Sequence, residues 1–269
     1  MRELERKPGT SALSEALPPI LVIGRGRVGG AFATAGSALG LPITLAGRDG
    51  AAAAAAGRYA AIYLCVPDAE IDAACRDVVA AGGGDTLIGH ASGALGLDAL
   101  AAATEAGGGT FCLHPLQTIP DPTSALAGAP AAIDGSSPEA LALARDLATA
   151  LGMRPFEVAA EARAAYHAAA CIASNFLIAI EESAAGLLEA AGVEDGRELL
   201  TPLVLRTAGN WTEQGAAGLT GPIARGDRAT VERHLAAIKV AAPELIPLYV
   251  ILAERTRQIA ESSNGEPSR

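Results

Sequence analysis

Lysine and aromatic residues are both scarce in this chain of 269 residues. Aromatic side chains make up 3% of it, so alanine, leucine and valine must supply most of the 50% that is hydrophobic. Lysine occurs only as Lys7 and Lys239. The 20 basic residues are outnumbered by 30 acidic ones, which gives a formal charge of −10. This charge argues against nucleic acid or an anionic membrane surface as a partner, and an anionic ligand would need local arginines.

Paired cysteines and long apolar runs are also missing. The four cysteines have no C-x-x-C spacing and lie in apolar runs, as expected of buried thiols in a reducing compartment. No histidine or acidic spacing supports a metal site. No secretory signal is visible, and the long helical region near 161–192 carries charged side chains, which argues against a membrane span. We therefore expect a soluble, cytoplasmic protein without a metal.

Strand and helix patterns alternate from 18 to about 158, and helices follow alone. The expected strands are Ile20–Ile23, Ile43–Leu45, Ala61–Val66, Thr86–Gly89, Thr110–Leu113, Ala131–Ile133 and Phe156–Val158. The expected helices include Val28–Leu39, Pro138–Leu151, Glu161–Ala191, Arg197–Gln214, Arg228–Ala237 and Pro243–Glu261. The pattern predicts an α/β protein: a Rossmann-type, mostly parallel sheet over 18–158, then an all-helical domain over 159–261. Residues 1–17 are expected to form a disordered arm and 262–269 a tail.

A glycine-rich turn joins the first expected strand to the first helix. It reads Gly24-Arg25-Gly26-Arg27-Val28-Gly29. In such a turn the first glycine permits the tight bend, the second lets the backbone approach a pyrophosphate, and the third lets helix and strand pack closely. Amides at the helix N-terminus then meet the phosphates. Its position between strand and helix predicts dinucleotide binding by these six residues, and the alternative is an ordinary turn.

Arg48 stands near the end of the second strand, where an acidic residue usually grips the ribose of NAD(H). An arginine there suits the 2′-phosphate, so NADP(H) is the expected cofactor and NAD(H) the less favoured one. Asp49 keeps the second option open. Val66 and Pro67 end the third strand and Ser92 follows the fourth, so these residues are expected beside the cofactor.

Several motifs together resemble a known group of proteins. They are GRGRVG, Leu64–Asp68, His90–Gly93, His114–Gln117, Tyr166–Ala170 with Ser174-Asn175, and Leu219–Asp227. They resemble bacterial Rossmann-like proteins whose C-terminal half is a domain of unknown function. The architecture is similar to that of the 6-phosphogluconate dehydrogenase superfamily, which includes pyrroline-5-carboxylate reductase, β-hydroxyacid dehydrogenases and ketopantoate reductase.

The resemblance covers residues 18 to 258 and implies a homodimer formed through the helical domain, with a small-molecule substrate in the interdomain cleft. It supplies no particular substrate. Two of those relatives use a lysine early on the first long helix of the second domain. Neither Lys7 nor Lys239 matches that position, so another proton donor is expected.

His167, Cys171 and Asn175 follow one another at i, i+4 and i+8, which places them on one face of a continuous helix. Imidazole there could protonate a carbonyl or imine while Asn175 orients it. The alternative is a helix-packing face. His114 follows the fifth strand and is a second candidate acid, or else a structural histidine.

Four further residues are candidate substrate contacts. They are Ser92, Gln117, Thr220 and Arg225. Arg225 could clamp a carboxylate or phosphate, and a purely structural loop with Asp227 is the alternative. His90 and His234 are expected to be structural and solvated, respectively.

Two functions remain open from the sequence. The first is an NADP(H)-dependent oxidoreductase acting on a small anionic carbonyl or imine compound. The second is a non-catalytic dinucleotide-binding protein that senses redox state or regulates a partner. The resemblance adds use of a deazaflavin as a third.

Overall fold

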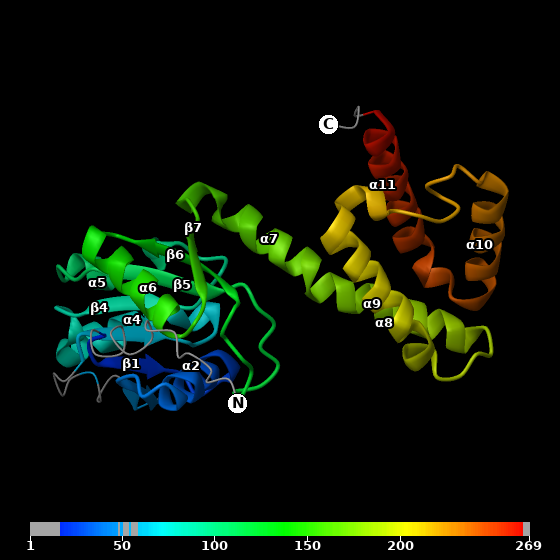
Figure 1. Ribbon diagram of the computed structural model, residues 1–269. Helices are drawn as coiled ribbons and strands as arrows, with labels where there is room; N and C mark the ends of the chain where they lie inside the picture. Colours follow the sequence, from blue (N-terminus) through cyan, green and yellow to red (C-terminus); the bar gives the residue numbers. More distant parts are fainter. Residues whose placement is uncertain (1–16, 48, 51–53, 55–58, 266–269) are drawn as a thin grey trace, which may run out of the picture. The chain divides into compact units, whose positions relative to one another are not determined.

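The computed structural model describes residues 17–47, 49–50, 54 and 59–265, and the chain divides into two compact units between Cys171 and Ile172 (Figure 1). The first unit is an α/β sheet domain and the second is helical. Their boundary falls after the first turns of the long helix, later than the expected 158/159, because those turns pack on the sheet.

The sheet of the first unit has seven strands in the order β2-β1-β3-β4-β5-β6-β7. The strands are β1 (Ile20–Ile23), β2 (Ile43–Ala46), β3 (Ala61–Leu64), β4 (Leu87–His90), β5 (Thr110–Pro115), β6 (Pro130–Gly135) and β7 (Arg154–Glu157). All neighbours are parallel except β5 and β6, which pair antiparallel. The predicted mostly parallel sheet is confirmed.

Apolar side chains alternate between the two faces of the sheet and form a core on each side. Val22 and Tyr63 belong to one core, which α2 (Arg27–Ala38) and α6 (Pro138–Ala150) cover. Leu21 and Leu64 belong to the other, which α4 (Ile71–Val78) and α5 (Ala101–Glu105) cover. Burial on both faces is what the near-continuous apolar strands predict. It fixes the loops at the carboxyl ends of the strands.

The helical unit contains few buried apolar residues of its own. Its helices are the end of α7 (Arg163–Ala173), then α8 (Asn175–Ala190), α9 (Gly196–Gln214), α10 (Arg228–Ala241) and α11 (Ile246–Gly265). Among its described residues, the buried hydrophobic ones are Ala185, Ile238, Ala242 and Ala253. So small a core is weak for a unit of this length.

Three boundaries differ from the sequence expectations. Leu17, expected in the disordered arm, is 8% exposed and joins the core, whereas residues 1–16 lie outside the described part. The last helix continues to Gly265, past the expected end at 261. The expected helix 161–191 is broken at Ser174, whose φ of −125° and ψ of −74° interrupt the helical backbone.

Candidate functional site

The glycine-rich turn is tightly packed at two of its three glycines. Gly24 has a φ of +120°, and a Cβ there would lie 2.3 Å from the carbonyl oxygen of Cys65. A Cβ on Gly29 would lie 2.0 Å from the carbonyl oxygen of Gly24. Neither position can carry a side chain without moving backbone. These two glycines therefore hold the turn against the neighbouring strand.

Gly26 differs from them because the space above it is open. No atom lies within 4 Å of where its Cβ would be. Gly26 is the N-cap of α2, and neither a capping side chain nor an acidic residue occupies the first turn. The amides of that turn are therefore available to an anion, and the helix dipole favours negative charge there.

A cavity of about 960 Å³ opens next to this turn, at the carboxyl ends of β1, β2 and β3. Of the predicted cofactor residues, its lining includes Gly24, Arg25, Gly26, Val66 and Pro67. A volume of this size suits a ligand as large as a dinucleotide. The open cradle at Gly26 and this cavity together fit the predicted group.

The remaining predicted cofactor residues stand elsewhere. Gly29 packs inside the turn, and Val28 packs against the core. Arg27 is exposed and outside the cavity lining. Arg48 lies outside the described residues. Arg25 lies over Gly47, which follows the end of β2: its Nε would be 3.4 Å from a Cβ added to Gly47. Among the described residues, Arg25 therefore brings a guanidinium to that strand end.

Three aromatic and imidazole side chains meet further along the same edge of the sheet. His114, at the end of β5, has its Nδ1 2.7 Å from the Tyr166 hydroxyl on α7. The rings of His114 and His167 lie edge to face with centroids 6.0 Å apart. Gly93 closes over both, since a Cβ there would lie 2.7 Å from His114 Nε2 and 2.8 Å from His167 Cδ2. The structure thus brings together two of the three predicted catalytic residues.

Burial keeps the His114–Tyr166 pair uncharged at neutral pH. Desolvation, followed by the charges of His167 and Arg163, lowers the pKa of His114 to about 4. Desolvation raises the pKa of Tyr166 to about 12. A protonated His114 is therefore rare at neutral pH, whereas the phenol proton of Tyr166 is present. At neutral pH, Tyr166 is therefore a better candidate proton donor than His114.

Ser92 is committed to its own loop. Its hydroxyl donates to Asp68 Oδ2 at 2.8 Å and accepts from the amides of Ala94 and Leu95 at 3.2 and 3.0 Å. It also joins the segments that follow β3 and β4. His90 is buried, with Nδ1 accepting from the Ser92 amide at 3.2 Å and Nε2 3.0 Å from the Gly96 carbonyl oxygen. Both ring nitrogens are used, which agrees with a structural histidine.

Of four other predicted residues, Gln117 belongs to the sheet unit, and Asn175, Thr220 and Arg225 belong to the helical unit. Gln117 is exposed beyond β5, and its side-chain oxygen accepts from the amide of Thr118. Asn175 starts α8 beyond the break at Ser174, so the single-face spacing with His167 does not carry across. Thr220 and Arg225 are exposed in the helical unit. These assignments stay predictions.

Arg225 lines a second, polar cavity of about 740 Å³ within the helical unit. Arg228 and Arg257 also line it. Asp227 instead caps α10 by accepting from the amide of Thr230 at 3.0 Å. The hydrogen bonds from Thr230 lower the pKa of Asp227, and the nearby charges of Arg233 and Arg225 add to this effect, so a structural loop of Arg225 and Asp227 stays the alternative.

Two contributors were not singled out from the sequence. Tyr166 stood in a quoted motif without a role, and Asp68 ended another. The signal was present, because Tyr166 and His167 adjoin on an alanine-rich helix. Their contact with His114 depends on chain segments 52 residues apart, which no local pattern reveals.

The fold and the turn define a class of protein: a Rossmann-type α/β unit followed by a helical unit. Residues 129–256 match the family model of a domain of unknown function, DUF2520. The expected Rossmann-like protein with a C-terminal domain of that kind is confirmed. No curated protein sequence matches the chain significantly.

Solved structures share the fold at low sequence identity. A candidate NADP oxidoreductase of Bacteroides fragilis is 21% identical with a TM-score of 0.74, and the match covers 90% of this chain and 98% of that one. A Thermotoga maritima protein is 22% identical with a TM-score of 0.71, covering 91% and 99%. A reductive aminase of Aspergillus terreus, in complex with NADPH and ethyl levulinate, is 17% identical with a TM-score of 0.64, covering 91% and 98%.

Proposed function

We propose that the protein is an NADP(H)-dependent oxidoreductase acting on a small carbonyl or imine compound. The observation that carries this proposal is the open phosphate cradle at Gly26, with its cavity, on the same sheet edge as the His114–Tyr166–His167 cluster. Parallel sheets bind ligands along that edge. The B. fragilis and A. terreus proteins, whose names refer to NADP or NADPH, support the choice of cofactor.

The chain's own residues would divide the work as follows. The amides at Gly26 hold the pyrophosphate, and Arg25, with Arg48 from the sequence, meets the 2′-phosphate. The bound nicotinamide supplies or accepts a hydride at the substrate carbon. In the reducing direction the substrate oxygen or nitrogen needs one proton. We assign this role to Tyr166, whose contact with His114 supports it, and His167 is the alternative donor.

His114 can restore the proton that Tyr166 gives away. In the tautomer that carries its proton on Nδ1, His114 donates to the Tyr166 oxygen, which leaves the phenol proton free to face the substrate. Transfer from Tyr166 to the substrate is then followed by transfer from Nδ1 to Tyr166, while Nε2 of His114 takes up a proton from solvent, so that the imidazole stays neutral throughout. The proposal that the substrate is anionic depends on Arg225 alone. Asn175 remains the residue proposed to orient the substrate.

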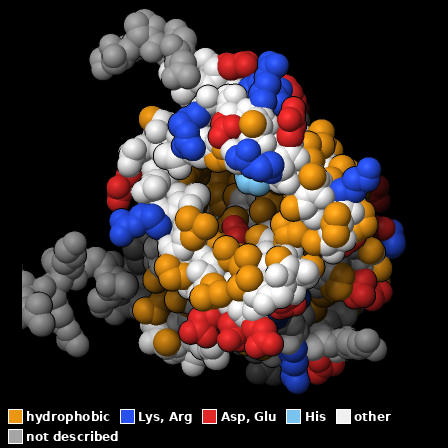
Figure 2. Space-filling view, turned by 90° about the vertical axis from the view of Figure 1, so that its right-hand side faces the viewer, with side chains coloured by type: hydrophobic (Ala, Val, Ile, Leu, Met, Phe, Trp, Pro, Cys, Tyr) orange, Lys and Arg blue, Asp and Glu red, His pale blue; other side chains and the backbone are white. Residues whose placement is uncertain are grey.

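We further propose a homodimer formed through the helical unit. Large apolar side chains of this unit stay exposed on the single chain, among them Phe176 at 56%, Leu203 at 63% and Trp211 at 70%. Figure 2 shows apolar side chains gathered over the face turned to the viewer. Patches of this kind mark interaction surfaces in water-soluble proteins. A second copy would complete the small core described above.

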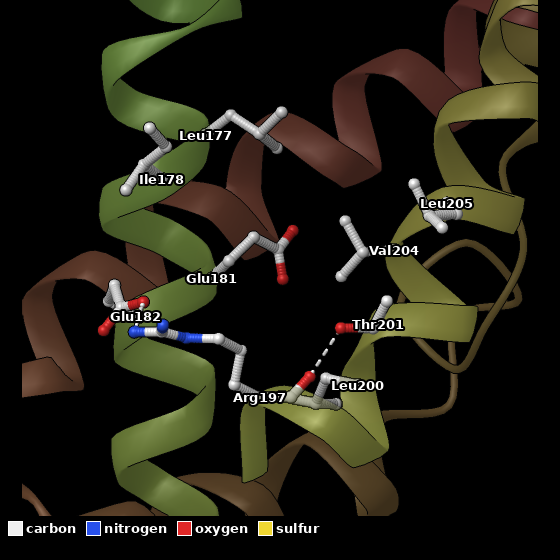
Figure 3. A pocket seen from close by; sticks show the side chains of 9 residues that line it. All are labelled: Leu177, Ile178, Glu181, Glu182, Arg197, Leu200, Thr201, Val204 and Leu205. Atoms are coloured by element: carbon white, nitrogen blue, oxygen red, sulfur yellow. Dashed lines mark hydrogen bonds and ion pairs between the residues drawn. The ribbon is translucent and has the colours of Figure 1, made fainter. Parts of the chain in front are cut away.

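The gap between α8 and α9 adds to this surface. It encloses about 320 Å³, lined mainly by leucine, isoleucine and valine side chains, and Glu181 points into it (Figure 3). Arg197 pairs with Glu182 at 2.7 Å beside it. An apolar surface that ends in such charged pairs resembles the core and rim of a protein interface.

The segment Ala160–Ala190 is also long and apolar enough to cross a membrane, by length and composition alone. Its first turns carry Tyr166 and His167, which pack on the sheet domain, and Glu181 and Glu182 lie in its second half. We therefore assign its apolar surface to the dimer and propose a cytoplasmic protein.

The first test is titration of the purified protein with NADPH and NADH, followed by fluorescence and checked by thermal shift. Tighter binding of NADPH supports the cofactor assignment, and binding of neither rejects the proposal. Keto acids, ketones and cyclic imines are then screened with Tyr166→Phe and His167→Ala as variants. Binding without turnover of any compound would favour the non-catalytic redox sensor. Sedimentation checks the dimer, in which the emission of Trp211, the sole tryptophan, should shift to the blue.

A further inference from the structure

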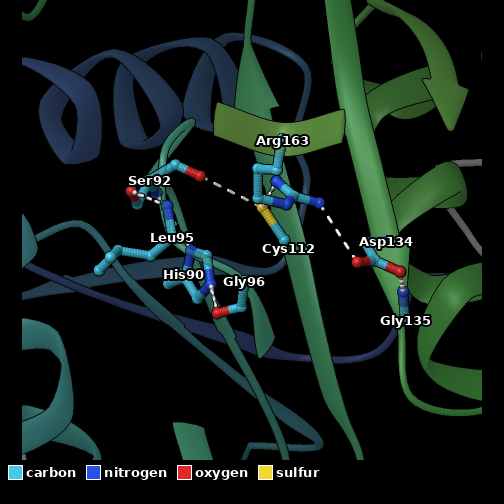
Figure 4. A network of polar contacts seen from close by, with 8 residues as sticks. All are labelled: His90, Ser92, Leu95, Gly96, Cys112, Asp134, Gly135 and Arg163. Atoms are coloured by element: carbon cyan, nitrogen blue, oxygen red, sulfur yellow. Dashed lines mark hydrogen bonds and ion pairs between the residues drawn. The ribbon is translucent and has the colours of Figure 1, made fainter. Parts of the chain in front are cut away.

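Arg163 begins α7 and is almost fully buried, at 1% exposure. Its Nη1 donates to Cys112 Sγ on β5 at 3.1 Å, and its Nη2 lies 3.3 Å from Asp134 Oδ2 on β6 (Figure 4). One guanidinium thus joins the start of α7 to two strands. A buried ion pair is weak evidence for stability, because desolvation offsets the attraction. A role in positioning explains the arrangement better.

The spacing along helix and strand supports such a role. Tyr166 and His167 stand three and four residues after Arg163, so they lie on the same side of α7 one turn later. His114 stands two residues after Cys112 and so faces the same side of β5. One turn of helix advances about 5 Å and two strand residues about 7 Å. Arg163–Cys112 and Tyr166–His114 therefore form two successive contacts between the same pair of elements.

We propose that Arg163 is the positioning residue of the site: its guanidinium fixes the first turn of α7 on β5 and β6, which places Tyr166 and His167 against His114. This inference rests on the proposed function where it concerns turnover. Burial is the largest cause of the low pKa of His114, followed by the charge of His167 and then that of Arg163, while Asp68 acts in the opposite sense and His90 adds a smaller effect. Arg163 thus fixes the place of the cluster and contributes to keeping His114 uncharged.

The unpaired Nε of Arg163 is consistent with this assignment. It is buried and has no hydrogen-bond partner in the described part of the chain. If the role of Arg163 were to stabilise the fold through its hydrogen bonds, all of its buried donors would be expected to have partners. Here the two terminal nitrogens reach β5 and β6, and the third donor is left without a partner. The arrangement thus bridges the two strands, although one donor of the guanidinium has no hydrogen-bond partner.

The test compares Arg163→Met and Arg163→Lys with a control, Arg145→Met, which removes an exposed arginine paired with Glu157 in the same unit. The four histidines are followed by NMR titration, NADPH binding by fluorescence, and turnover with any substrate found in the screen. For Arg163→Met we expect unchanged NADPH affinity, a higher titration midpoint for His114, and turnover lowered about 100-fold, as for a 1 Å misplacement. The control should match the wild type in all three.

Arg163→Lys separates charge from position. The lysine keeps the positive charge but lacks the two terminal nitrogens that contact Cys112 and Asp134 at the same time. The pKa of His114 should therefore stay close to its wild-type value, while turnover should stay low. If Arg163→Met does not fold, this variant decides, and wild-type turnover in it would overturn the proposal. A folded Arg163→Met with unchanged His114 titration and turnover would do the same. Failure of the wild type to bind NADPH would reject the proposed function instead, and the His114 titration would still judge the role of Arg163.

Discussion

Replacing Gly26 by alanine should separate cofactor binding from folding. Gly26 has φ −75° and ψ −171°, an extended conformation that alanine adopts freely, and its Cβ would meet no protein atom. The free energy of unfolding should therefore change by no more than about 1 kcal/mol. The methyl group would occupy the space that a pyrophosphate needs. Losing one charge-assisted amide contact costs about 1.5–3 kcal/mol, or roughly 10- to 100-fold in the Kd of NADPH.

The matched comparison is Gly29→Ala, where the added Cβ would lie 2.0 Å from a backbone oxygen. That variant should lose about 1–3 kcal/mol of stability, because strand and helix must separate. Urea unfolding and NADPH titration of both variants check the pair of outcomes. If Gly26→Ala binds NADPH like the wild type, the turn is an ordinary strand-to-helix connection and the phosphate cradle is wrong.

Three further outcomes follow from the same edge of the sheet. Arg25→Ala should lower the NADPH-to-NADH affinity ratio about 10-fold or more, measured by paired titrations, whereas the exposed Arg27→Ala should leave it unchanged. Gly93→Ala should displace the rings of His114 and His167, so their NMR signals should shift and turnover should fall about 100-fold while NADPH still binds. The depressed pKa of His114, about 4 against an ordinary 6.5, means that the unfolded chain takes up the proton first on acidification. Stability should therefore fall by at most about 3 kcal/mol between pH 6.5 and 4, and His114→Gln should flatten that slope in urea unfolding curves.

Most of the sheet domain could be predicted from the sequence because its signals are local. Each strand is a short apolar run between polar turns, and the glycine turn has fixed spacing. The antiparallel pairing of β6 with β5 was less accessible. It depends on how the loop between Pro115 and Pro130 returns the chain, and the apolar pattern of a strand does not record its direction.

The site was predictable as a set of residues and not as a set of contacts. His114 and His167 were both candidates, but the hydrogen bond that selects Tyr166 joins distant segments. Asn175 illustrates the opposite error. Neither glycine nor proline marks the break at Ser174, so periodicity extended one helical face across it.

The protonation states of the cluster bear on the kind of substrate it can serve. A tyrosine with a pKa of about 12 and a histidine with a pKa of about 4 are both neutral between those values. Such a pair offers hydrogen bonds and no fixed charge, whereas Arg163 is committed to Cys112 and Asp134. A neutral donor gains most when charge develops during the reaction, as it does on the oxygen of a carbonyl that receives a hydride. Under the proposed function, a substrate already charged at the reacting atom would gain less, so we expect neutral carbonyl or imine groups as substrates, with any anionic group bound away from the cluster.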